Sequence, residues 1–129
     1  MNNKLKQNEN RNVAILGASD RADRYAYKAF KLLQEHGYNT FLVHPTLKVV
    51  EGQKVYANLS DINEAIDTIT VYVNSNISSS MANQIIDQSP KRVIFNPGAE
   101  NIDMAGKLMA KGIDSENACT LVLLSTNQF

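Results

Sequence analysis

The chain has 129 residues, of which 43% are hydrophobic, and its 13 Lys+Arg balance 13 Asp+Glu. This length predicts one domain that buries its core without a disulfide or a structural metal. The single cysteine, Cys119, excludes a disulfide within the chain, and with His36 and His44 it gives too few ligands for a structural zinc site. The zero net charge disfavours nucleic acid as a partner, because that affinity comes largely from an excess of Lys and Arg.

Residues 1–11 read MNNKLKQNENR, a polar segment without the apolar stretch of a signal peptide. We expect a disordered polar tail over residues 1–11 and a single domain over residues 12–129. The longest apolar stretches are far shorter than the roughly 20 residues that a membrane-spanning helix needs. Together with the lone cysteine, this predicts a cytoplasmic protein with no membrane partner.

The first elements along the chain alternate between strand and helix. Residues 13–16 form a continuous apolar run before Gly17, which is typical of a strand buried on both faces. Apolar residues at helical spacing predict a helix over residues 22–36. A second strand is expected over residues 39–44, ended by Pro45, which cannot donate a ladder hydrogen bond.

The middle of the chain continues the alternation. After a loop, Val55 and Tyr56 are expected to pair briefly, and Ser60 to cap a short helical turn that runs to Ile66. Residues 68–73 read TITVYV, the composition of a central parallel strand. A helix over residues 78–89 follows.

The last third predicts a strand over residues 92–95 and a helix over residues 101–111. The helix is expected to turn four apolar residues inward: Ile102, Ala105, Leu108 and Met109. Residues 113–118 and 121–124 complete the pattern, with Cys119 after an edge strand.

Strands separated by helices imply right-handed crossovers and a parallel sheet covered on both faces. The predicted fold is therefore α/β, a Rossmann-like doubly wound parallel sheet in three layers, α/β/α. Ligands of such sheets lie beyond the carboxyl ends of the strands, where the winding reverses. This rule places the candidate site in four loops, at residues 17–24, 44–48, 74–77 and 96–100.

The first of these loops is the candidate phosphate site. Gly17, Ala18 and Ser19 end the first strand and open the predicted helix, where backbone amides at the positive end of the helix dipole favour an anion. The alternative is that Gly17 only turns the chain while Ser19 or Asp20 caps the helix.

The ligand class is narrowed by two departures from the dinucleotide fingerprint. No second glycine follows Gly17 before Gly37, which disfavours a close-packed pyrophosphate. The second strand ends in His44 and Pro45, where an NAD enzyme usually has an acid for the ribose hydroxyls. Lys48 suits a phosphate on a ribose, which favours CoA or NADP over NAD. The alternative for this side chain is an exposed loop lysine.

Several segments together carry a family resemblance. They are VAILGASDRADRY (13–25), YKAFKLLQEHGY (27–38), the strand-end HP (44–45), VEGQKVYANLSDI (50–62) and RVIFNPGAEN (92–101). As a set in this order they resemble the small stand-alone bacterial CoA-binding proteins, which are similar to the N-terminal CoA-binding domain of the succinyl-CoA synthetase alpha subunit. The resemblance covers about residues 12–129.

The resemblance implies that the adenosine diphosphate part of CoA lies across the carboxyl edge of the sheet. It implies phosphate contacts from Gly17, Ala18 and Ser19, added charge from Arg24, and an adenosine border at Pro45 and Lys48. It implies that Val73, Asn74 and Ser75 lie beside the nucleotide, and that Asn96, Pro97, Gly98 and Glu100 shape the exit for the pantetheine arm. The chain departs from the pattern at His44, where many relatives have Asn, and near Asn74 and Pro97, where the synthetase domain has proline and acidic residues.

The expected function is non-catalytic binding of coenzyme A or an acyl-CoA, with sensing, carrying or regulation through a protein partner or a homo-oligomer. Ligase activity is not expected, because the synthetase uses a phosphorylated histidine in a second domain and a partner subunit. One alternative is an NADP-binding oxidoreductase fragment or subunit. Another is an interaction protein that keeps the fold without a ligand. Cys119 is either a packing residue or a partner for the CoA thiol in a mixed disulfide.

Overall fold

The computed structural model describes residues 10–129, so the predicted tail lies outside the described residues apart from Asn10 and Arg11. The strands are β1 (Asn12–Leu16), β2 (Asn39–Val43), β3 (Val49–Val50), β4 (Gln53–Tyr56), β5 (Thr68–Val71), β6 (Arg92–Phe95) and β7 (Asp114–Asn117). The helices are α2 (Tyr25–Glu35), α3 (Ser75–Ser80), α4 (Ala82–Asp87), α5 (Ile102–Ala110) and α6 (Thr120–Ser125), with a 3-10 turn, η1, at Leu59–Asp61.

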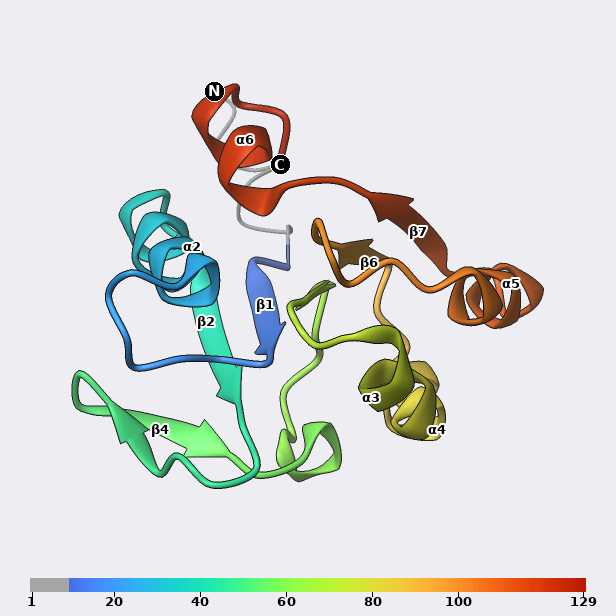
Figure 1. The fold of residues 1–129 in the computed structure, drawn as a ribbon, viewed down its shortest axis with the longest axis horizontal. Helices are drawn as coiled ribbons and strands as arrows, with labels where there is room; N and C mark the ends of the chain where they lie inside the picture. Colours follow the sequence, from blue (N-terminus) through green and yellow to red (C-terminus); the bar gives the residue numbers. More distant parts are fainter. Residues whose placement is uncertain (1–9) are drawn as a thin grey trace.

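The sheet confirms the predicted architecture. Its order is β3-β4-β2-β1-β5-β6-β7, and every pairing is parallel except that of β3 with β4. The chain winds outward from β1 in one direction through β2 and in the other through β5, with helices on both faces (Figure 1). This is a Rossmann-like doubly wound fold, whose winding reverses between β1 and β5.

Alternate residues of β1 feed two separate cores, because successive strand side chains point to opposite faces. Val13 and Ile15 pack under α2 and α6, whereas Ala14 and Leu16 pack under α4 and α5. The helices contribute Phe30, Leu33 and Leu124 to the first core, and Ile85, Met104 and Leu108 to the second. Both faces of the central strands are therefore buried, which explains their continuous apolar runs.

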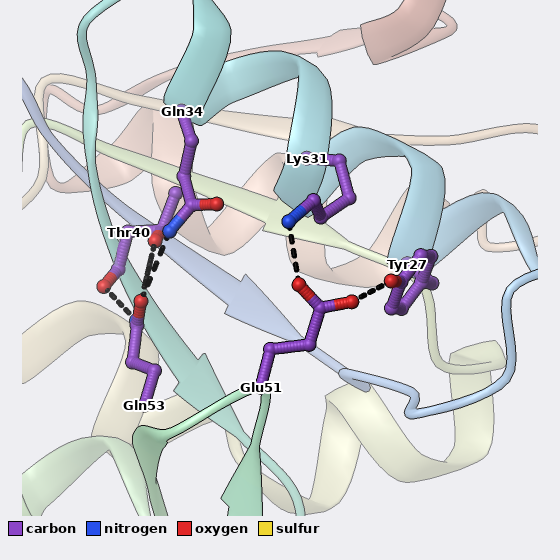
Figure 2. A network of polar contacts seen from close by, with 6 residues as sticks. All are labelled: Tyr27, Lys31, Gln34, Thr40, Glu51 and Gln53. Atoms are coloured by element: carbon purple, nitrogen blue, oxygen red, sulfur yellow. Dashed lines mark hydrogen bonds and ion pairs between the residues drawn. The ribbon is translucent and has the colours of Figure 1, made fainter.

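The hairpin of β3 and β4 was not expected beyond a brief pairing at Val55. Glu51 and Gly52 form its two-residue turn, both with positive φ (49° and 79°), as a hairpin turn that matches the strand twist requires. The glutamate carboxylate accepts hydrogen bonds from the Tyr27 hydroxyl and from Lys31 Nζ, the latter at 2.5 Å (Figure 2). These contacts hold α2 against the hairpin.

Two helix predictions in the first half of the domain are wrong in detail. The first helix starts at Tyr25 instead of residue 22. The helical turn over residues 60–66 is reduced to η1, in which the Ile62 amide donates to the Leu59 carbonyl. The side chain of Gln88 also donates to the carbonyls of Leu59 and Ile62.

The expected helix over residues 78–89 is two helices. It begins earlier, at Ser75, because the Asn74 side chain accepts a hydrogen bond from the Ile77 amide and caps α3. Met81 then ends α3 and starts α4 with non-helical dihedrals (φ −106°, ψ 15°). The preceding strand accordingly stops at Val71 instead of residue 73.

The inward face predicted for the helix over residues 101–111 is right for Leu108 and wrong for Ile102 and Met109. Ile102 and Met109 are 88% and 78% exposed, whereas Met104 and Leu108 are buried. The segment over residues 121–124 lies within α6. No helix among residues 10–129 has the length and apolar character needed to cross a membrane.

Candidate functional site

A cleft of about 1150 Å³ opens at the carboxyl edge of the sheet, where the winding reverses. Its walls are the loop after β1, the first turns of α2, the ends of β2 and β5, and the exposed side of α3 and α4. Its charged and polar lining residues are Ser19, Asp20, Arg21, Asp23, Arg24, Lys28, His44, Asn58, Asn74, Ser80 and Gln84. Its apolar lining includes Leu47, Ala57, Val73, Ile77 and Met81. The cleft thus has a charged part beside α2 and an apolar part beside α3.

The turn at Gly17 joins β1 to the cleft. The amides of Gly17 and Ala18 both donate to the carbonyl of Val43, at 3.1 and 3.0 Å, so they are already used at the sheet edge. Gly17 has φ +95°, and a Cβ there would lie 2.8 Å from Cγ1 of Val73. The glycine is therefore required by close packing against the end of β5.

Ser19 also makes a local bond. Its hydroxyl accepts a hydrogen bond from the Arg21 amide at 3.1 Å, which shapes the loop before α2. The expectation that residues 17–19 open directly into a helix is wrong, since the loop continues to Arg24.

The N-terminus of α2 brings free backbone donors to the cleft. Arg24 is its N-cap and makes no side-chain capping bond. Lys28 is the first residue of the helix whose amide bonds back, to the Arg24 carbonyl at 3.1 Å. Within residues 10–129 the amides of Tyr25, Ala26 and Tyr27 have no hydrogen-bond acceptor. Three open amides at the positive end of an 11-residue helix favour an anion.

Side chains around this helix end add charge of both signs. Arg21, Arg24 and Lys28 line the cleft, and the carboxylates of Asp20 and Asp23 lie among them. All five side chains are exposed, so water moderates their fields. The three cations outnumber the two acids, so the net charge of these side chains is positive. The helix dipole is also positive at this end, and both therefore attract an anion.

His44 organises the loop after β2. Its Nδ1 accepts hydrogen bonds from the amides of Thr46 at 3.1 Å and Leu47 at 3.0 Å. An Nδ1 that accepts cannot carry the proton, so the ring is neutral with hydrogen on Nε2. A side-chain oxygen of Asn accepts from following amides in the same way, which explains how His can replace Asn at this position.

Tyr72 lies at the end of β5, between the cleft and the α2 side of the core. Its hydroxyl oxygen is buried and has no partner with hydrogen-bond geometry in the described part of the chain. Burial raises the pKa of the Tyr72 phenol to about 12, an effect that the nearby hydroxyls of Thr120 and Thr70 reduce. The phenol is therefore neutral across the physiological range.

The structure brings most of the predicted site residues together. Those that line the cleft are Gly17, Ala18, Ser19, Arg24, Pro45, Val73, Asn74 and Pro97. Those outside its lining are Lys48, Ser75, Asn96, Gly98 and Glu100. The four predicted loops do meet at one edge, as the topological rule requires.

The residues outside the lining have other contacts. Asn96 is 2% exposed; its Nδ2 donates to Thr70 Oγ1 and its Oδ1 accepts from the Thr120 amide. Its side chain thus turns into the sheet instead of toward a ligand. The Glu100 carboxylate accepts from the Gly98 amide at 3.0 Å. Lys48 is exposed on the loop before β3.

Several lining residues were not singled out from sequence. Lys28 follows Arg24 by one helical turn, a spacing that places both on one helix face and was a usable signal. Met81 and Gln84 line the cleft because α3 and α4 pack beside β5. No local sequence pattern predicts this packing. Among residues 10–129 no group of three or more His, Cys, Asp or Glu side chains is placed to hold a metal ion.

Comparison with known proteins identifies the family to which this chain belongs. The sequence pattern of the CoA binding domain matches residues 11–125. The chain belongs to the CoA binding domain family. The crystal structure of an uncharacterized protein matches this chain with a TM-score of 0.88. The two sequences are 38% identical, and the match covers 95% of this chain and 100% of that chain.

Two further relatives are more distant. The uncharacterized protein YneT of Bacillus subtilis is 28% identical over 100 residues, which cover 78% of this chain and 74% of that protein. The acetyl-coenzyme A synthetase 1 of Ca. Korarchaeum cryptofilum, solved in complex with phosphate and ADP, is 17% identical with a TM-score of 0.72. That match covers 92% of this chain and 28% of the synthetase, and it shows a shared fold.

Proposed function

We propose that this CoA binding domain protein binds coenzyme A or an acyl-CoA in the cleft and acts without catalysing a reaction on it. The observation that carries the proposal is the open N-terminus of α2. Tyr25 and Ala26, whose amides are free, line the same cleft as Arg24 and Lys28, and the free amide of Tyr27 follows in the same helical turn. Backbone donors and cations converging on one point suit a phosphate group.

The size and composition of the cleft support the same ligand. Its volume of about 1150 Å³ lies slightly above the usual range of ligand sites, roughly 300 to 1,000 Å³, and suits a long nucleotide. The pyrophosphate would lie at α2, and the apolar wall of Val73, Ile77 and Met81 would cover uncharged parts of the ligand. The synthetase that shares the fold is named for acetyl-coenzyme A, which is an acyl-CoA.

The proposal of non-catalytic action is supported by the chemistry of His44. A neutral imidazole has one ring lone pair, and here that lone pair already accepts two backbone hydrogen bonds. The ring is therefore a poor general base in this arrangement. Cys119 is outside the lining of the cleft, so no thiol nucleophile stands beside the bound ligand.

Calorimetric titration of CoA, dephospho-CoA, NADP and NAD into the purified chain tests the ligand class. We expect CoA to bind with a dissociation constant of about 1 µM or below. The dissociation constant of NAD should be larger by a factor of about 10 or more. NADP is the sharper competitor, since it shares a ribose phosphate with CoA. Binding of NADP or NAD as tight as that of CoA would overturn the proposal.

Two matched substitutions locate the phosphates. If Lys48 meets the ribose phosphate, as the sequence predicts, Lys48→Ala weakens CoA but not dephospho-CoA, by about 1 to 3 kcal/mol. If the cations at α2 meet the pyrophosphate, Arg24→Ala weakens both ligands to the same extent. Native mass spectrometry of protein purified from cells then shows whether the ligand carries an acyl group.

A further inference from the structure

The outer face of α5 is apolar although none of residues 10–129 covers it. Ile102 and Met109 are 88% and 78% exposed, the two highest values among the large hydrophobic residues of the described chain. They lie two helical turns apart, on the side opposite the buried Met104 and Leu108. In Figure 1, α5 forms the right-hand end of the molecule, beyond the edge strand β7. This apolar surface is remote from the cleft, whose lining includes no residue of α5.

Gly106 lies at the centre of the same face and has no role in the packing of this chain. A Cβ built on it would meet nothing within 4 Å, and its backbone is helical. Glycine inside a helix lowers stability relative to alanine. Because the chain itself gives no reason for a glycine here, close approach of a second helix backbone is a physical reason for it.

We propose that α5 pairs with α5 of a second copy of this chain, antiparallel about a two-fold axis that passes beside Gly106. Each residue of a helix advances about 100° around the axis. With the two glycines opposed, Ile102 of one copy therefore faces Met109 of the other along one side of the contact. The two-fold axis repeats this contact, so the apolar side chains of both copies are covered.

The charges on the other side of the contact are complementary to themselves. Asp103 and Lys107 flank Gly106 on the side away from Ile102, and both are exposed. Neither takes part in an ion pair within the described residues. In the antiparallel pair the Asp103 carboxylate of one copy faces the Lys107 ammonium of the other, and the reverse pair follows by symmetry. A parallel two-fold arrangement sets the charged side of each copy against the apolar side of the other, so the pattern selects the antiparallel one.

The neighbouring edge of the sheet does not offer the same partner a better place. β7 reads DSEN, and its exposed Asp114 and Glu116 would meet their own copies if two β7 edges paired. Charged edge strands resist such pairing. The helix face is therefore the surface at this end that fits a second copy.

Sedimentation equilibrium of the full chain at increasing concentration tests the pairing. One helix pair buries less than the standard interface of roughly 1,600 Å², so we expect a weak dimer with a dissociation constant of about 10 to 100 µM. Ile102→Asp places a charge in the apolar side and should leave the protein monomeric; because an acid is favourable in the first turn of a helix, the fold should survive. A monomer at all concentrations up to the millimolar range would overturn the proposal.

Charge exchange identifies the surface. Asp103→Lys should weaken the dimer about tenfold or more, because two cations then face each other. The double variant Asp103→Lys with Lys107→Asp should restore association to near the original strength. The control Asp87→Lys, the same change on α4, should have no effect. A dimer that none of the α5 variants weakens has its interface elsewhere, which would also overturn the proposal.

Gly106→Ala separates packing within the chain from packing between chains. A methyl group enters open space in the monomer, so the melting temperature measured at low concentration should rise by about 2 to 6 °C. The same methyl group separates the two helices in the dimer, so association should weaken several-fold. A merely structural glycine would not give opposite signs in the two measurements, and unchanged association would overturn the close approach at this residue.

Discussion

Two helix N-termini in this protein are finished in opposite ways. At α5 the Asn101 side chain accepts a hydrogen bond from the Met104 amide at 3.0 Å, and the residue is only 6% exposed. At α2 Arg24 makes no side-chain cap, and the first amides face a cleft. One end is closed by the chain itself and contributes to stability. The other is left open, and an open end at a cleft is where an anionic ligand supplies the missing acceptors.

The closed end should be the more costly one to damage. Asn101 Nδ2 also donates to the Ser75 carbonyl and to the Ser78 and Ser79 hydroxyls, so it joins α3 to α5. Asn101→Ala removes the cap and leaves the buried Ser78 hydroxyl without this donor, and we expect a loss of about 2 to 4 kcal/mol in the free energy of unfolding. Urea denaturation measures it.

The matched variant Asn101→Asp keeps a capping oxygen but removes the amide donor, so its loss should be smaller than that of alanine. Affinity for CoA should be unchanged in any variant that still folds, because Asn101 is outside the cleft lining. A stable Asn101→Ala protein would show that the closed end contributes little.

Tyr72 tests whether incomplete polar bonding on the cleft side also affects stability. Its hydroxyl is buried without a bonded partner, and its pKa is raised from 10.0 to about 12. A raised folded pKa means that the folded state holds the proton more tightly, so this contribution is complete below pH 10 and is lost as the pH rises to about 12. Relative to Tyr72→Phe, the wild-type chain should lose about 2 to 3 kcal/mol of stability over that interval.

The comparison of the two proteins cancels the titration of the other tyrosines and the lysines. Near neutral pH, Tyr72→Phe should be neutral or slightly stabilising, because it removes a polar group that lacks a partner. A parallel pH dependence of the two proteins above pH 10 would show that the phenol ionises freely in the folded state.

The open end of α2 can be closed deliberately. Arg24→Ser supplies a hydroxyl that accepts from the first-turn amides, whereas Arg24→Ala removes the same cation without providing a cap. We expect the serine variant to be more stable than the alanine variant by about 0.5 to 1 kcal/mol, measured by urea denaturation. It should also bind CoA more weakly than the alanine variant, because its hydroxyl competes with phosphate for the same amides. Equal affinity of the two variants would place the phosphates away from α2.

The sequence predicted the sheet and the edge that holds the cleft, because both follow from rules that use only the order of buried strands and helices. It did not predict where α2 begins. Asp20 and Asp23 are residue types that often cap helices, but neither caps α2. The Ser19 hydroxyl accepts a hydrogen bond from the Arg21 amide, and the loop continues to Arg24 before the helix starts. Local composition therefore placed the start of the helix too early in the chain.

Side-chain direction was the second limit. On α5 the predicted inward face joined Leu108, which is buried, to Ile102 and Met109, which are exposed, because apolar spacing alone could not fix the rotation of the helix. The buried Asn101 anchor fixes the rotation of the helix, and that contact is long-range. The direction of the Asn96 side chain could not be predicted either. It was expected to shape the exit for the pantetheine arm, whereas its side-chain amide donates hydrogen bonds to β5.

A comparably small effect is expected at His44, which gives a side-chain acceptor to backbone amides at the end of β2, as Asn101 does at α5. Its Nδ1 accepts from Thr46 and Leu47, so His44→Ala should cost about 1 kcal/mol through the loss of two local bonds. His44→Asn supplies an oxygen at a similar reach and should recover most of that stability. Hydrogen exchange of the Thr46 and Leu47 amides in the wild-type chain and in both variants measures this directly. We expect protection to fall in the alanine variant and to be largely kept in the asparagine variant, and equal protection in all three proteins would mean that the ring does not hold the loop.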